Sequence, residues 1–133
     1  MASPITNPIA KQVSNAFARQ YYHLWENSPN QVYRFYKDCS KLIRPEDNGT
    51  MSTTTTIEKI KDKLLALRRL CTWRSLHLVT VDEHSCITGG VFVVATGYTT
   101  EKDGQKKKFI QKFFLAPQAE GGYFLESDMV EPE

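Results

Sequence analysis

The sequence has little of what marks several specialised classes of protein. Its three cysteines form no CxxC pair, so neither a disulfide framework nor a zinc ribbon is indicated, and reduced thiols are expected. No hydrophobic run approaches the roughly 20 residues that cross a bilayer. Residues 1–10 lack the apolar stretch of a secretory signal. These absences predict a cytoplasmic protein with no membrane segment.

Charge of one sign is not in excess either. The chain carries 17 Lys and Arg against 15 Asp and Glu, and its pI is near 8.4. Domains that bind nucleic acid through phosphate contacts usually have a pI above about 9. The 133 residues are 41% hydrophobic and 11% aromatic, which is enough for one domain with one core. The composition therefore indicates a single folded domain and gives no support to nucleic-acid binding by it.

Helical periodicity dominates the first half of the chain. Apolar residues recur every three or four positions over residues 9–26, which predicts an amphipathic helix. A second, short helix is expected over 29–36, because a proline suits its first position. A strand over 40–44 follows. Thr55 and Glu58 have capping-box spacing, so a third helix is expected to begin there.

Extended, β-branched segments dominate the second half. Strands are expected over residues 76–81, 91–99, 109–115 and 123–130. Residues 82–90 are expected to form a turn with a bulge, since glycines end this segment. Helices followed by a run of antiparallel strands indicate the α+β class, with helices packed on one face of a curved sheet.

Two of these strands carry apolar side chains on both faces. Phe92 alternates with Val93, and Phe114 points to the face opposite Phe113. Three helices can cover only one face of the sheet, so the other face needs a partner. A two-fold homodimer is the favoured partner, and a sheet that curls enough to bury both faces by itself is the alternative.

No motif of a familiar catalytic class is present. The sequence lacks a Walker loop, GxGxxG, HExxH and GxSxG. His77, His84 and Cys86 lie near one another in the chain, but their spacing matches no zinc site, so neither a metal nor a cofactor is expected.

Acid–base catalysis is the enzymatic alternative. The candidate groups lie at helix ends: Asp38, Tyr36 and Tyr22. A small-molecule enzyme would need one of them, or another carboxylate, inside an open pocket. Since the inward strand positions are expected to be filled by Phe, Val and Leu, no catalytic residue is assigned.

One edge of the first helix combines apolar residues with a single amide. The residues spaced by three or four along this edge are Val13, Phe17, Gln20 and Leu24. A groove for an extended peptide needs such a surface, because the rings supply burial and the amide pairs with the ligand backbone.

Four segments together carry a family resemblance. They read FARQYY at 17–22, YRFY at 33–36, FIQKFFLAP at 109–117 and YF at 123–124. They resemble the nuclear transport factor 2-like domain of the Ras-GTPase-activating-protein-binding proteins, a stress-granule scaffold family. The resemblance implies a cone-shaped α+β fold over residues 1–133, with three helices packed on a curved antiparallel sheet. Residues 1–8 would form an extended segment, and residues 131–133 would start a linker.

The resemblance also implies a non-catalytic domain that dimerises through its sheet and binds short Phe-containing motifs of FGDF or FxFG type. The implied groove residues are Val13, Phe17, Gln20, Leu24, Arg34, Phe35 and Tyr123. The family usually has Lys-Phe where this chain has Gly122-Tyr123, so a charge contact with an acidic motif residue is not carried over.

The implied partners are proteins that carry such motifs, viral proteins among them, in the cytoplasm and, under stress, in stress granules. RNA contact is expected only from regions outside this chain, and no membrane contact is expected. The alternatives are an isomerase- or dehydratase-like enzyme of the same fold, and a transport factor that carries a small GTPase.

Overall fold

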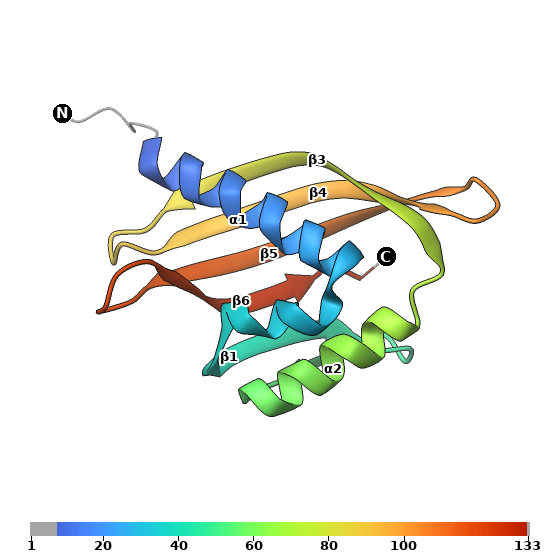
Figure 1. Cartoon of the computed structure of the whole chain (residues 1–133), viewed down its shortest axis with the longest axis horizontal. Helices are drawn as coiled ribbons and strands as arrows, with labels where there is room; N and C mark the ends of the chain where they lie inside the picture. Colours follow the sequence, from blue (N-terminus) through green and yellow to red (C-terminus); the bar gives the residue numbers. More distant parts are fainter. Residues whose placement is uncertain (1–7, 133) are drawn as a thin grey trace.

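The computed structural model describes residues 8–132, and in it two strands separate the first two helices from the third (Figure 1). The elements are α1 (Pro8–Asn27), the 3-10 helix η1 (Pro29–Phe35), β1 (Tyr36–Pro45), β2 (Met51–Thr54), α2 (Ile57–Arg69), β3 (Trp73–Ser85), β4 (Val91–Glu101), β5 (Lys106–Pro117) and β6 (Tyr123–Val130). The extended segment expected over 1–8 lies outside the described residues except for Pro8, at which α1 begins.

The third helix begins one residue later than the capping box predicts. Thr56, and not Thr55, is the N-cap of α2, and its hydroxyl oxygen accepts from the backbone N–H of Lys59 at 3.4 Å. The Asp38 carboxylate, from β1, accepts from the backbone N–H of Ile57 at 2.9 Å. Two side chains thus satisfy two of the free N–H groups at this helix end, one of them from a distant strand that local spacing cannot reveal.

The six strands form one sheet in the order β2-β1-β6-β5-β4-β3. All neighbouring pairs are antiparallel except β1 and β6, so the expected antiparallel sheet contains one parallel pair. The connection from β1 to β6 contains α2 and four other strands, which gives the long crossover that parallel pairing requires.

The strands also differ from the expected ones in number and extent. The short edge strand β2 was not predicted, because three of its four residues are serine or threonine and show no apolar alternation. The turn expected over 82–90 is shorter, because β3 continues to Ser85 and its Asp82 and His84 pair with Val94 and Phe92 of β4. The bulge lies earlier in β3, between Leu78 and Thr80.

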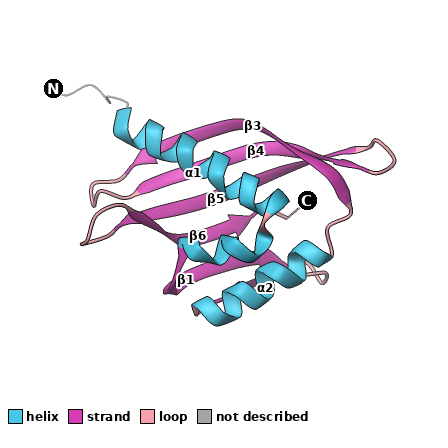
Figure 2. Cartoon of the chain, in the orientation of Figure 1, coloured by secondary structure: helices cyan, strands magenta, loops and turns pink. Residues whose placement is uncertain are grey.

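All three helices lie on the same face of the sheet (Figure 2). On that face Val91, Val93 and Phe113 are buried. On the opposite face Phe92 and Phe114 stay half-buried, since no described helix covers them. The two-sided apolar character read from the sequence is therefore present, with only one side covered by this chain.

The core beneath the helices is rich in aromatic rings. Tyr21 of α1 lies at its centre, with ring centroids 4.9 Å from Phe113 and 5.7 Å from Phe17. Within residues 8–132, none of the helices combines the length and apolar character that crossing a membrane requires.

Candidate functional site

An apolar groove opens between α1, η1 and the β5–β6 hairpin, and it encloses about 280 Å3. Its lining residues are Val13, Ala16, Phe17, Gln20, Phe35, Leu115, Tyr123, Phe124 and Leu125. Five of the seven residues expected at a peptide groove, those at positions 13, 17, 20, 35 and 123, therefore lie around one pocket. The volume lies just below the roughly 300–1,000 Å3 of small-molecule sites, so it suits one or two aromatic side chains.

Two lining rings belong to the hydrophobic core as well as to the groove. The Phe17 side chain is only 8% exposed, and its ring meets Phe35 edge-on at 5.2 Å and Phe113 at 4.9 Å. The Phe35 ring lies 5.9 Å from that of Tyr21. This packing holds both rings in place, so the wall of the groove is formed before any ligand binds.

The polar edge of the groove comes from Gln20 and Tyr123. Gln20 is exposed on α1, and in the part of the chain that the structure describes its carboxamide has no hydrogen-bond partner. Tyr123 is half-buried at the start of β6, and its backbone carbonyl accepts from the Gln118 side chain at 3.2 Å. The free carboxamide can donate to and accept from the backbone of an extended peptide.

Two residues expected at the groove lie outside its lining. Leu24 is one helical turn beyond Gln20 and packs, partly buried, against the core. Arg34 is exposed on η1, next to Phe35, which points inward. Helical spacing placed Leu24 on the correct edge of α1, but the groove ends before that edge does.

Sequence reasoning missed four lining residues, Ala16, Leu115, Phe124 and Leu125. Ala16 follows Val13 by three positions, so helical spacing could have found it. Phe124 could not be found this way, because strand alternation puts it opposite Tyr123.

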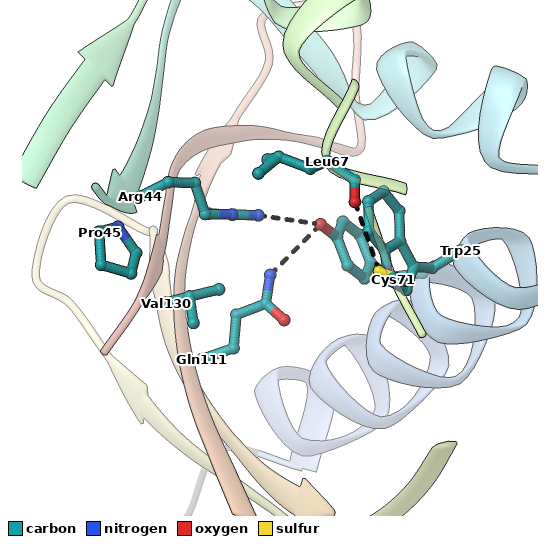
Figure 3. A pocket seen from close by; sticks show the side chains of 8 residues that line it. Trp25, Arg44, Pro45, Leu67, Cys71, Gln111 and Val130 are labelled. Carbon is teal, nitrogen blue, oxygen red and sulfur yellow. Dashed lines mark hydrogen bonds between the residues drawn. The ribbon is translucent and has the colours of Figure 1, made fainter. Parts of the chain in front are cut away.

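A second cavity of about 260 Å3 opens into the interior, between the end of α1, the end of α2 and the sheet (Figure 3). Its residues are Tyr21, Trp25, Arg44, Pro45, Leu67, Cys71, Gln111 and Val130. The expectation of a fully packed interior is therefore wrong at this point, because inward positions of β1 and β5 carry Arg44 and Gln111 instead of apolar side chains.

The polar groups that line this cavity, those of Tyr21, Arg44 and Gln111, hydrogen-bond to the carboxylate of Asp128. Asp128 lies in β6 and is completely buried. Arg44 forms an ion pair with it, with Nη1 2.9 Å from Oδ1 and Nη2 3.1 Å from Oδ2. The hydroxyls of Tyr21 and Tyr36 donate to Oδ2 at 2.9 and 2.5 Å, and the Gln111 amide donates to Oδ1 at 2.7 Å. Each carboxylate oxygen thus accepts at least two hydrogen bonds.

Burial sets the acid–base properties of the groups around this carboxylate. Desolvation, with the nearby Asp128 charge, raises the pKa of the Tyr21 and Tyr36 phenols well above the usual value. Desolvation alone would lower the pKa of Arg44, but the Asp128 charge outweighs it and the pKa is raised. The phenols therefore stay neutral and the guanidinium stays charged at any physiological pH.

These groups do not form an acid–base site. Asp128 is enclosed by its donors and does not line the cavity, so it cannot accept a proton from a molecule there. The candidate Tyr22 donates to Gln111 at 2.7 Å, and Asp38 caps α2. Burial raises the pKa of the Cys71 thiol, which keeps it in the weakly nucleophilic protonated form.

His77 and His84 both lie along β3. The His77 ring stacks on Tyr98 at 4.9 Å, and the His84 ring lies tilted over Phe92 at 6.4 Å. No three His, Cys, Asp or Glu side chains gather as a metal site within the described residues. The cysteines there are free thiols, and Cys39 is exposed on β1.

Comparison with known proteins agrees with this architecture. Nuclear transport factor 2 of Arabidopsis thaliana is 43% identical over 128 residues, which cover 96% of this chain and 27% of that protein. The putative G3BP-like protein of Schizosaccharomyces pombe is 30% identical over 114 residues, 85% of this chain and 25% of that protein. This chain thus spans about a quarter of the length of either relative.

Among solved structures, the yeast UBP3-associated protein BRE5 superposes with a TM-score of 0.75 at 23% identity, over 96% of both chains. Nuclear transport factor 2 of Cryptosporidium parvum superposes with a TM-score of 0.76 at 23% identity, over 97% of this chain and 98% of that one. Residues 13–131 match the nuclear transport factor 2 (NTF2) domain. The cone-shaped α+β fold is confirmed, and the chain belongs to the NTF2 domain family.

Proposed function

We propose that this domain is a non-catalytic interaction module that binds short Phe-containing motifs, of FGDF or FxFG type, in the apolar groove between α1, η1 and β6. The observation that carries the proposal is the groove itself, a preformed aromatic wall beside the unpaired carboxamide of Gln20. A motif ring would pack on Phe17 and Phe35 while the carboxamide pairs with the peptide backbone.

The expected affinity follows from the area that such a motif can bury. Two phenylalanine rings gain about 3–6 kcal/mol when they leave water. Ordering a short disordered peptide consumes part of this gain, so a dissociation constant in the micromolar range is expected for one groove.

The similar proteins support an interaction role. One relative is described as G3BP-like, and one solved structure is described as a UBP3-associated protein. By analogy with these proteins, we propose a scaffold that recruits motif-bearing partners in the cytoplasm and, under stress, in stress granules.

We further propose that two copies associate through the uncovered face of the sheet. Phe92, Val94 and Phe114 are half-buried there, and such an apolar face usually marks an interface. A two-fold dimer would present two grooves, so a bivalent partner could gain roughly 10²–10⁴ in avidity.

A calorimetric titration with an FGDF-type peptide tests the groove. We expect micromolar binding near one peptide per chain, and no binding when both motif Phe residues are replaced by Ala. Gln20→Ala should weaken binding about 3- to 10-fold, the value of one hydrogen bond of about 0.5–1.5 kcal/mol. Arg19→Ala, at the exposed neighbouring position of α1, is the matched control and should leave binding unchanged.

Phe17→Ala is a poor test of the groove, although the sequence points to it. The ring is part of the core, and such a truncation costs about 3–5 kcal/mol of stability, so lost binding could reflect lost folding. If folded wild-type protein binds no peptide, the groove assignment is refuted and the interior cavity becomes the candidate site.

A further inference from the structure

The positive charge of Lys37 lies at the rim of the groove. Lys37 is on β1, a strand on which the sequence predicted no groove residue. The Lys37 ammonium, from β1, lies 4.7 Å from the ring centroid of Phe124, which lines the groove. Its Nζ is also 3.4 Å from Oε1 of Glu120, in the β5–β6 turn. Among the described residues, Lys37 is the one cation that lies over a ring of the groove lining.

The backbone of Lys37 is fixed beside the groove while its side chain stays free to move. Its N–H donates to Oγ of Ser40 at 2.9 Å, and that hydroxyl donates to the carbonyl of Leu125, a groove residue, at 2.6 Å. The adjacent Tyr36 pairs with Leu125 in the sheet. The Lys37 side chain is 43% exposed, so the ammonium can turn to another anion at small cost.

Glu120 is held only loosely against Lys37. Its side chain is 68% exposed, and it lies in a turn closed by two backbone hydrogen bonds, Gln118 to Gly122 and Gly121 to Gln118. An exposed ion pair of this kind contributes little to stability. A carboxylate that arrives with a ligand can therefore take the place of Glu120.

We propose that Lys37 makes the groove selective for an acidic residue next to the bound aromatic residue, and that Glu120 occupies the position of that ligand carboxylate when the groove is empty. The inference rests on the proposed function and assigns its charge specificity. Gly122 precedes Tyr123 and has no charge, so the cation comes from β1 instead of from β6. The other polar lining side chains, Gln20 and Tyr123, are uncharged.

The ligand carboxylate is expected to displace Glu120 from Lys37, because its charge pair with Lys37 is better shielded from water. A peptide over Phe124 excludes water from one side of the ammonium, and a charge pair that is partly shielded from solvent is screened less by salt. Glu120, on the solvent side of Lys37, gains no such shielding.

Two peptides that differ only in charge test the inference: Phe-Gly-Asp-Phe and Phe-Gly-Asn-Phe, each with the same neutral flanks. Wild-type protein should bind the Asp peptide about 2- to 5-fold more tightly at low salt, and the ratio should shrink at high salt. Lys37→Gln should bring the ratio to about one while the affinity for the Asn peptide stays the same. Lys41→Gln, an exposed lysine further along β1, should keep the wild-type ratio.

Glu120→Gln tests whether Glu120 competes with the ligand carboxylate for Lys37. Without the competing carboxylate, the Asp peptide should bind about 2- to 5-fold more tightly than to wild type, with no change for the Asn peptide. An unchanged affinity for the Asp peptide overturns the role of Glu120.

The outcomes distinguish this inference from the proposed function. Equal binding of the two peptides by wild-type protein, or a preference that survives Lys37→Gln, overturns the inference and leaves the groove intact. If neither peptide binds, the groove assignment fails and the inference fails with it.

Discussion

Asp128→Asn removes the negative charge of a buried ion pair while keeping the shape of the side chain. In the native protein the carboxylate accepts from Arg44, Gln111 and the hydroxyls of Tyr21 and Tyr36. An asparagine amide keeps one acceptor oxygen, and its NH2 group faces donors where the second oxygen was. Arg44, only 7% exposed, is then left without its counter-charge.

The expected loss is large because, among residues 8–132, Asp128 is the carboxylate that pairs with Arg44. Removing one partner of a buried pair costs about 3–5 kcal/mol. For a chain of this length each kcal/mol lowers the melting temperature by about 3–5 °C, so a fall of roughly 10–20 °C is expected. Replacing both partners by apolar residues, Arg44→Met with Asp128→Leu, should recover most of this loss, since no charge then remains buried.

Chemical denaturation followed by circular dichroism measures the change in unfolding free energy. The control is Glu126→Gln on the same strand, whose side chain is exposed and whose change should stay within about 0.5 kcal/mol. A loss below about 1 kcal/mol for Asp128→Asn would refute the structural role. A gain in stability would point instead to a catalytic carboxylate, because active sites commonly sacrifice stability for activity.

Two further predictions concern the phenols and the sheet face. Burial raises the native pKa of three tyrosines, Tyr21, Tyr22 and Tyr36. Their contribution to stability is full below about pH 10, the usual value in an unfolded chain, and is lost as the pH rises above it. In a pH titration followed by phenolate absorbance, three of the six tyrosines should therefore stay un-ionised until the protein unfolds. Ionisation of all six before unfolding would contradict this. Val94→Lys, on the uncovered face, should turn a dimer into a folded monomer in sedimentation equilibrium, whereas a monomeric wild type would refute the interface.

Local patterns determined the elements whose evidence lies within a few residues. The three- and four-residue spacing over 9–26 is enough for α1, because a helix repeats every 3.6 residues. The same spacing brought Val13, Phe17 and Gln20 to one edge, and these three do line the groove. Alternation likewise predicted that β4 and β5 are apolar on both faces.

Contacts between distant segments were decided only by the tertiary structure. Arg44 and Asp128 are 84 positions apart, and no local spacing relates them. Their strands become neighbours because β1 pairs in parallel with β6 across the long connection, which also places Lys37 beside Phe124 and Glu120. The helical and strand repeats of the sequence thus determined which face each side chain takes. The pairing of charges and the extent of the groove depend instead on strand order and register, which the repeat within a single segment does not encode.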